Sequence, residues 1–191
     1  MYHVLREHIS KIIELTDDEW ADLRSCFSPM SLQKREFLLQ AGEVCHSLAF
    51  IEKGALYACS ADGQGSSTVI QFAFEGHGIG DISSFLTGEQ SRRNIEALED
   101  CELLLFPREN WDGIFERVPR FERYTRILMQ NAFVALQRRI DGTVGRSAEE
   151  RYAYLVGAYP ELTTRVPQHL IASFLGISRE TLSRIRRQGR F

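Results

Sequence analysis

Short hydrophobic runs separated by glycine-rich turns mark the chain between residues 32 and 106. The runs read REFLLQ, LAFIEKGALYACS, STVIQFAF and CELLLF, and the turns between them include ADGQG and EGHGIG. Apolar runs of this kind, with turn residues about every 8–12 positions, are typical of antiparallel strands in a barrel or jelly roll. We therefore expect an α+β chain that begins with a double-stranded β-helix, or jelly-roll, barrel.

A helix is expected ahead of these strands, in the stretch LTDDEWADL. Thr16 can cap its first turn, and Glu19 stands three positions later, which is the spacing of a capping box. Together with such N-terminal helices, the barrel domain is expected to cover residues 1–118.

One long helix is predicted from about Arg120 to Val144, because this stretch has no proline and, apart from Gly142, no glycine. Its hydrophobic positions form two stripes. The first stripe steps by four and three residues, as in a coiled-coil seam, through Met129, Phe133, Leu136, Ile140 and Thr143. The second stripe consists of Phe121, Tyr124, Leu128, Ala132 and Ala135.

A helix that packs only against its own barrel needs one apolar stripe, so a second stripe favours a partner. We predict a homodimer that forms through residues 129–143, with residues 119–145 as the dimerisation helix. A single wide stripe that faces one core is the alternative. A further helix is expected in SAEERYAYLVGAY, and YPELTTRV follows it as a short connector.

Charge is distributed unevenly along the chain. The whole chain carries −3 at neutral pH, whereas residues 164–191 contain six arginines and a single acid, Glu180. This segment therefore carries +5, which leaves −8 on residues 1–163. A basic segment on an acidic body indicates binding to a polyanion, with a solvated basic tail as the alternative.

The basic segment also has the spacing of a helix-turn-helix, in VPQHLIASFLGISRETLSRIRR. Ala172 is small where two helices could cross, and Gly176, four residues later, supplies a sharp turn. Ser178 can then cap the next helix. Two helices that cross over a short turn need residues of these types at these offsets. We assign residues 146–191 to a helix-turn-helix domain.

On the second helix of this motif, Leu182 and Ile185 are expected to point inward and the arginines outward. An arginine can donate two hydrogen bonds to guanine O6 and N7, and a glutamate can accept one from cytosine N4. Arg186, Arg187 and Arg190 are better placed for phosphates, which fix the register of a protein on DNA. The residues expected at double-stranded DNA are Ser178, Arg179, Glu180, Thr181, Ser183, Arg184 and Arg187.

A barrel followed by a long helix and a helix-turn-helix resembles the Crp/Fnr family of bacterial transcription regulators. SRETLSRI is similar to the family's recognition helix, and the resemblance implies base contacts for Arg179, Glu180 and Arg184. FEGHGIGDISSFLTGE, followed by IEALEDCELLLF, resembles the cyclic-nucleotide-binding module. The resemblance covers about residues 15–187 and adds RNA polymerase as a candidate partner. The β-wing of many members is expected to be missing here or supplied elsewhere, so the motif is a (winged-)helix-turn-helix.

The resemblance places an effector pocket at Gly80, Asp81, Ile82, Ser83, Ser91, Arg92 and Arg93. In nucleotide-binding members a glutamate binds the ribose, an arginine followed by serine neutralises the cyclic phosphate, and a hydroxyl pair meets adenine. Here Asp81 stands for the glutamate, Ser91 stands for the arginine, and Leu136-Gln137 stands for the hydroxyl pair. Arg92 or Arg93 could replace the arginine after a shift of one residue. We expect a degenerate pocket that binds cyclic AMP poorly, and we assign no cofactor.

Other classes of function have little support. No apolar run approaches the roughly 20 residues that span a bilayer, and the N-terminus lacks a signal-peptide core, so we expect a cytoplasmic protein with no membrane partner. The four cysteines (Cys26, Cys45, Cys59 and Cys101) form no C-x-x-C pair, and no H-x-H pattern supports a metal site or a cupin-type enzyme. We expect no enzyme. The alternative hypothesis is a ligand-binding barrel whose C-terminal helices bind a protein rather than DNA.

Overall fold

The structure is a computed structural model, which describes residues 2–61 and 67–189. In this part of the chain, strands form two antiparallel four-stranded sheets with the orders β1-β8-β3-β6 and β2-β7-β4-β5. The strands are β1 (Ser28–Leu32), β2 (Phe37–Leu39), β3 (Ser47–Lys53), β4 (Leu56–Ala61), β5 (Ser67–Ala73), β6 (Gly78–Ile79), β7 (Arg93–Ala97) and β8 (Cys101–Pro107). The predicted jelly roll of an α+β chain is therefore confirmed.

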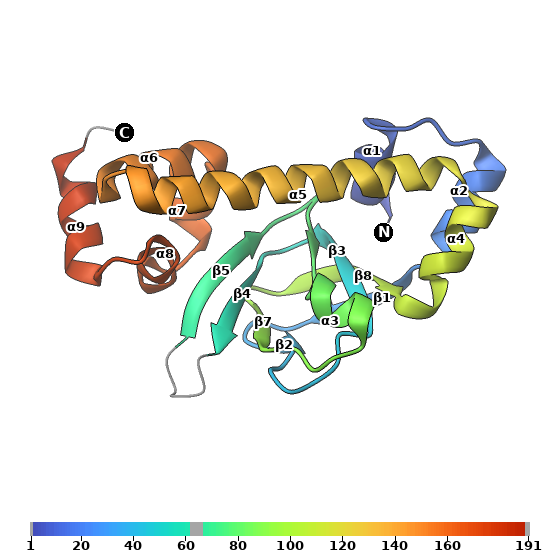
Figure 1. The fold of residues 1–191 in the computed structure, drawn as a ribbon, viewed down its shortest axis with the longest axis horizontal. Coiled ribbons are helices and arrows are strands. Elements are labelled where there is room, and N and C mark those ends of the chain that lie inside the picture. The colour runs from blue at the N-terminus through green and yellow to red at the C-terminus, as the bar shows by residue number, and fades with distance from the viewer. Residues whose placement is uncertain (1, 62–66, 190–191) are drawn as a thin grey trace.

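Helices lie before, within and after the sheets (Figure 1). They are α1 (His3–Ser10), α2 (Asp17–Ser25), α3 (Ile82–Thr87), the 3₁₀ turn η1 (Arg108–Asn110), α4 (Trp111–Arg117), α5 (Arg120–Gly145), α6 (Ala148–Ala158), α7 (Leu162–Arg165), α8 (Gln168–Leu175) and α9 (Arg179–Gln188). Within the described residues, no helix is both long enough and apolar enough to cross a bilayer.

Aliphatic side chains from both sheets meet in one core. Ile51 and Leu103 from the first sheet, and Leu56 and Ile95 from the second, are fully buried. Burial of such a side chain contributes about 1.5–3 kcal/mol. A slip of one residue would turn these side chains to the other face of the strand, so their burial fixes the register.

Two N-terminal helices pack against the barrel core. Leu5 and Ile9 of α1 are buried in the barrel core, and the carboxylate of Glu52 on β3 accepts a hydrogen bond of 2.8 Å from the Leu5 backbone N–H. A carboxylate at the start of a helix also complements the helix dipole. At α2, the predicted capping box between Thr16 and Glu19 is confirmed in both directions.

The long helix α5 runs along the long axis of the molecule, above the barrel (Figure 1). It spans 26 residues, which confirms the predicted single helix. Phe121 and Tyr124 of the second predicted stripe are buried against the barrel core. Ala132 and Ala135 are exposed instead, so the prediction of one continuous second stripe is wrong in its C-terminal half. There the helix leaves the barrel core behind.

The C-terminal helices form a second core. Leu182 and Ile185 of α9 are fully buried, and Ala172 of α8 is nearly so. Gly176 ends α8 in the left-handed conformation, with φ of 66°, and Ser178 caps α9, as the spacing predicted. The described helices therefore make the expected helix-turn-helix.

Two features of this region differ from the sequence-based expectation. The stretch taken as a short connector contains a helical turn, α7, whose Leu162 is fully buried. In addition, the second core is shared with the barrel, because Val69, Phe72 and Phe74 belong to the same cluster. The helix-turn-helix thus packs on the second sheet of its own barrel, with α8 beside β5 (Figure 1).

Candidate nucleic-acid interface

Helix α9 presents one polar face to solvent. The orientation of α9 about its own axis is set by Leu182 and Ile185, whose side chains are fully buried in the second core. Residues three or four apart share a helix face. The outward face is therefore formed by residues that are exposed or, for Ser183, half-buried: Arg179, Glu180, Ser183, Arg184 and Arg187. The predicted outward placement of these side chains is confirmed, and their contact with DNA stays a prediction.

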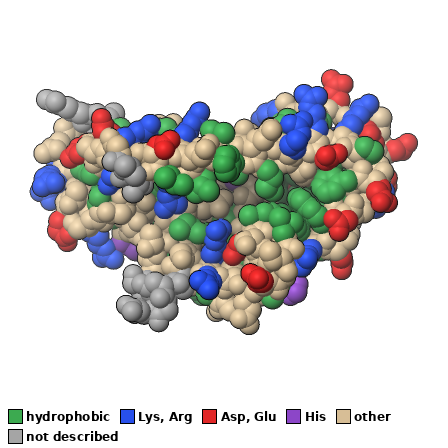
Figure 2. All heavy atoms as spheres, in the orientation of Figure 1, with side chains coloured by type: hydrophobic (Ala, Val, Ile, Leu, Met, Phe, Trp, Pro, Cys, Tyr) green, Lys and Arg blue, Asp and Glu red, His purple; other side chains and the backbone are tan. Residues whose placement is uncertain are grey.

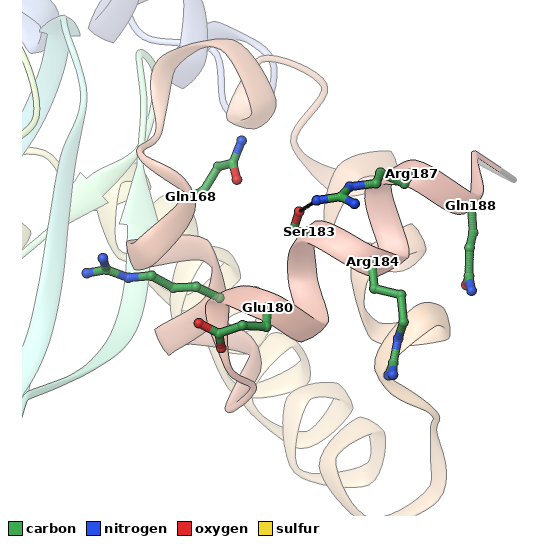
Figure 3. A pocket seen from close by; sticks show the side chains of 7 residues that line it. Gln168, Glu180, Ser183, Arg184, Arg187 and Gln188 are labelled. Carbon is green, nitrogen blue, oxygen red and sulfur yellow. Dashed lines mark hydrogen bonds between the residues drawn. The ribbon is translucent and has the colours of Figure 1, made fainter.

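An open hollow of about 530 Å³ lies along this face (Figure 3). Its lining consists of Gln168, Arg179, Glu180, Ser183, Arg184, Arg187 and Gln188. Sequence analysis did not select Gln168 or Gln188. Their spacing could have found both, because Gln168 stands in the first turn of α8 and Gln188 lies four residues after Arg184. Figure 3 shows Arg184 and Gln188 extending to the same side of α9.

Serine and threonine hydroxyls order this surface. The Thr181 backbone N–H donates a hydrogen bond of 3.2 Å to the Ser178 hydroxyl oxygen, which caps α9. These two residues, also predicted at DNA, do not line the hollow. The Arg187 guanidinium donates to the Ser183 hydroxyl at 3.3 Å, as the dashed line in Figure 3 marks. A held side chain loses less freedom when a ligand binds.

The arginines of this face suit a polyanion, and Glu180 adds one hydrogen-bond acceptor among their donors. Hydrogen bonds from its own backbone N–H and from the Ser178 hydroxyl lower the pKa of the Glu180 carboxyl. Glu180 is therefore an ionised acceptor at neutral pH, whereas each arginine offers only donors. Arg186 of the predicted phosphate group is half-buried, and Arg190 lies outside the described residues.

The predicted effector residues gather between α3 and β7. Asp81 is only 5% exposed, and its Oδ2 accepts a hydrogen bond of 2.8 Å from the Ser91 hydroxyl. Its Oδ1 accepts one of 3.2 Å from the Ser83 backbone N–H, which caps the short helix α3. The Nε of Arg93 lies 3.8 Å from Oδ2. The buried carboxylate is thus partnered by groups of the protein itself.

The remaining predicted pocket residues are less closely engaged. Arg92 is exposed, and Ile82 is half-buried beside the barrel core. Gly80 allows the chain to pass Leu48, whose Cδ2 would lie 2.6 Å from a Cβ at this position. Leu136 and Gln137, aligned with the adenine contacts, are exposed on α5.

Comparisons with known proteins agree with this arrangement. The model of the cyclic nucleotide-binding domain family matches residues 29–118. The fumarate and nitrate reduction regulatory protein of Vibrio cholerae is 28% identical over an alignment of 173 positions, which covers 84% of this chain and 67% of that protein. The cAMP-activated global transcriptional regulator CRP of Haemophilus influenzae is 22% identical over 78% of this chain and 70% of its own length.

A solved structure shows the same fold. It is a variant of CooA from Carboxydothermus hydrogenoformans, with a TM-score of 0.71 at 18% identity, covering 95% of this chain and 82% of that one. The matches thus run from the barrel through the helix-turn-helix. The chain is a distant homologue of the Crp/Fnr regulators. It is a Crp/Fnr-type transcription regulator with a cyclic nucleotide-binding domain. Its relatives are regulators rather than enzymes, and the relationship implies DNA binding and dimerisation.

A Crp/Fnr dimer needs an interface, and α5 offers an exposed apolar stripe. Met129, Phe133, Leu136 and Ile140 are between 42% and 60% exposed. The side chain of Thr143, the last member of the predicted seam, lies outside the described part of the structure. Figure 2 shows hydrophobic side chains along the side of the molecule where α5 crosses the view. Large exposed apolar side chains in a row are typical of an interaction surface.

The cysteines of this chain are shielded from solvent, and three of them (Cys26, Cys45 and Cys101) lie in the barrel core. All four are buried as free thiols. Burial raises the pKa of the Cys45 and Cys59 thiols, and raises that of Cys101 to about 11. Such thiols stay protonated at neutral pH and are poor nucleophiles and metal ligands. Among the described residues, no group of three or more His, Cys, Asp or Glu side chains could hold a metal ion.

Proposed function

We propose that a dimer of this regulator reads a two-fold symmetric operator, with α9 of each protomer in the major groove. The observation that carries the proposal is the outward face of α9, where Arg179, Glu180 and Arg184 are exposed around an open hollow. In a helix-turn-helix the start of the second helix meets base edges. The dimer forms through the apolar stripe of α5.

Base contacts and phosphate contacts fall to different residues in this proposal. Arg184 and Glu180 lie one helical turn apart and are assigned to base edges, where a bidentate arginine contact discriminates by about 1–3 kcal/mol. Arg187 and Gln168 also line the hollow and are assigned to phosphates. Phosphate contacts give affinity that falls with salt but carry no sequence information.

We further propose that the barrel pocket is a poor site for cyclic AMP. A cyclic phosphate would have to replace hydrogen bonds that Asp81 already makes, and it would meet this buried carboxylate with like charge. Ser91 stands where nucleotide-binding members have their arginine. No saturable heat is expected at sub-millimolar cyclic AMP in titration calorimetry. A micromolar dissociation constant would contradict this part of the proposal.

The wider assignment follows from the same features. Residues 1–118 are proposed as the barrel domain, 119–145 as the dimerisation helix and 146–191 as the DNA-binding domain. RNA polymerase is the proposed partner of the DNA-bound dimer, because a transcription regulator acts where transcription starts. We place this activity in the cytoplasm, where bacterial DNA lies.

Selection from a random duplex library tests the central proposal. We expect the wild type to enrich two-fold symmetric sequences whose half-sites lie about 34 Å, or one helical turn, apart. Enrichment of sequences that lack two-fold symmetry would contradict binding by a dimer that places one α9 in each half-site. No enrichment above a scrambled library would favour α9 as a protein-docking surface.

A further inference from the structure

We infer that the helix-turn-helix is clasped to the free edge of its own barrel, and that this clasp holds the recognition helix in its outward, DNA-accessible orientation. The clasp consists of Arg139, Arg165, Ser173 and Phe174 acting on strand β5 and its flanks. The inference deepens the proposed function, because it names what positions the proposed DNA-reading surface in place of a bound effector.

The clasp acts on an edge strand of the second sheet. β5 ends the order β2-β7-β4-β5 and so has one strand neighbour. An edge strand leaves backbone groups unpaired, and proteins cover such edges with other elements. Here the Val69 N–H donates to the Ser173 hydroxyl of α8 at 3.0 Å. The Val69 and Ile70 carbonyls accept from the Arg139 guanidinium of α5, the former at 3.1 Å.

Arg139 joins three elements at one point. Its guanidinium lies 4.4 Å from the ring centroid of Phe174 on α8, and Phe174 in turn packs against Phe72 of β5, 5.2 Å between centroids. Burial lowers the pKa of the Arg139 guanidinium, although an arginine keeps its charge at any physiological pH. A partly buried charge that leaves such partners loses hydrogen bonds and cation–π contact together.

A second attachment lies just beyond the other end of β5. Arg165 of α7 donates two hydrogen bonds to the Glu75 carboxylate, at 2.8 and 2.9 Å, and a further one to Glu99. Its guanidinium also lies 5.2 Å from the ring centroid of Phe74. Bidentate pairs of this kind restrict orientation as well as distance. Two attachments along one strand prevent the helix-turn-helix from rotating against the barrel, whereas a single attachment would allow it to pivot.

The clasped arrangement leaves the working surfaces free. Arg179 and Arg184 of α9 are exposed, and so are Leu136 and Ile140 of the α5 stripe. None of the groups that hold the helix-turn-helix belongs to the residues around Asp81. The orientation of α9 therefore depends on contacts between α5, α8 and β5, not on a molecule in the barrel.

Spin-label distances test the clasp without DNA. Labels are attached at His169→Cys on α8 and Glu43→Cys on the barrel, two exposed positions, while the native thiols are buried. Labelled protein is diluted with unlabelled protein so that distances within one protomer dominate.

Without any ligand, we expect one narrow distance distribution in the wild type. In Arg139→Leu/Ser173→Ala it should become broad, and the control Arg138→Leu, an exposed neighbour, should leave it narrow. A broad wild-type distribution, or a narrow one in the clasp variant, overturns the inference.

Hydrogen exchange and DNA binding extend the test. Exchange of the Val69 amide should accelerate at least about tenfold in Ser173→Ala alone, while amides of the barrel core stay protected. If the clasp variant spends about one tenth of its time in the competent orientation, its operator affinity falls about tenfold. Tighter operator binding would show that the clasp hides α9 and would overturn the outward orientation. If the wild type binds no operator, the proposed function fails, whereas the distance and exchange results still decide the clasp.

Discussion

The α9 surface and the Asp81 site differ in how their charges are satisfied. On α9, Arg179 and Arg184 are exposed, beside a hollow open to solvent. At Asp81, the carboxylate is buried and bound by Ser91, the Ser83 N–H and the nearby Arg93. Solvent-facing charges can accept a partner at little cost, whereas a partner at Asp81 must displace hydrogen bonds that already exist. These differences support the proposal that α9 reads DNA, whereas the Asp81 site has a structural role.

The largest effect is expected from separating the two protomers. Leu136→Glu/Ile140→Glu places like charges on the exposed stripe and should yield monomers in light scattering. Because two tethered half-site contacts reinforce each other, operator affinity should fall by about 100-fold or more. Gln137→Glu, on the same turn but off the stripe, serves as the control. A double variant that stays dimeric would move the interface away from α5.

An intermediate effect is expected at Asp81, and it should appear in stability alone. Asp81→Ala leaves the buried Ser91 hydroxyl and the Ser83 N–H without their acceptor, so the free energy of unfolding should fall by about 1–3 kcal/mol. Operator affinity at a temperature where the variant is folded should stay within about twofold, given the proposed structural role. Asp112→Asn, at an exposed carboxylate, is the control. Unchanged stability, or loss of operator binding in the folded variant, would break the contrast between the two regions.

The smallest effect is a pH dependence at the Arg165–Glu75 attachment. Burial pushes the pKa of Glu75 upward, but the hydrogen bonds from Arg165, from its own backbone N–H and from the Gly54 N–H, together with the charge of Arg165, hold the pKa below its ordinary value of 4.5. The stability that this pair contributes is therefore fully present above about pH 4.5 and is lost as the pH falls through the lowered pKa. Glu75→Gln should lower the urea midpoint at pH 7 and match the wild type near pH 3. A deficit that persists in acid would assign the effect to shape rather than charge.

The features that the sequence predicted well are those whose causes are local. The long helix follows from 25 residues without proline, and Gly176 and Ser178 mark the turn and cap of the motif because their roles depend on near neighbours. The outward placement of Arg184 follows from its spacing to the buried Leu182 and Ile185. Each of these inferences needs only the geometry of one helix or one turn.

The features that could not be predicted depend on how the whole chain folds. Arg139 donates hydrogen bonds to the Val69 and Ile70 carbonyls of β5, which precede it by 70 and 69 positions in the sequence. No periodicity in either segment indicates this contact. The buried hydrogen bond between Ser91 and Asp81 joins residues only ten positions apart, but no local pattern in the sequence indicates it. Ala132 and Ala135 are exposed because the residues of α5 that contact the barrel core are determined by the fold of the whole chain.

Operator binding by two single-arginine variants tests the central claim most directly. The dissociation constants of wild type, Arg184→Ala and Arg187→Ala are measured on the selected operator and its single-base variants over a range of salt concentrations. Arg184→Ala should cost about 1–3 kcal/mol and relax the preference at one base pair in each half-site. Arg187→Ala should weaken all sequences alike and reduce the salt slope by about one. A full sequence preference in Arg184→Ala would contradict the assignment of α9 as the surface that reads bases.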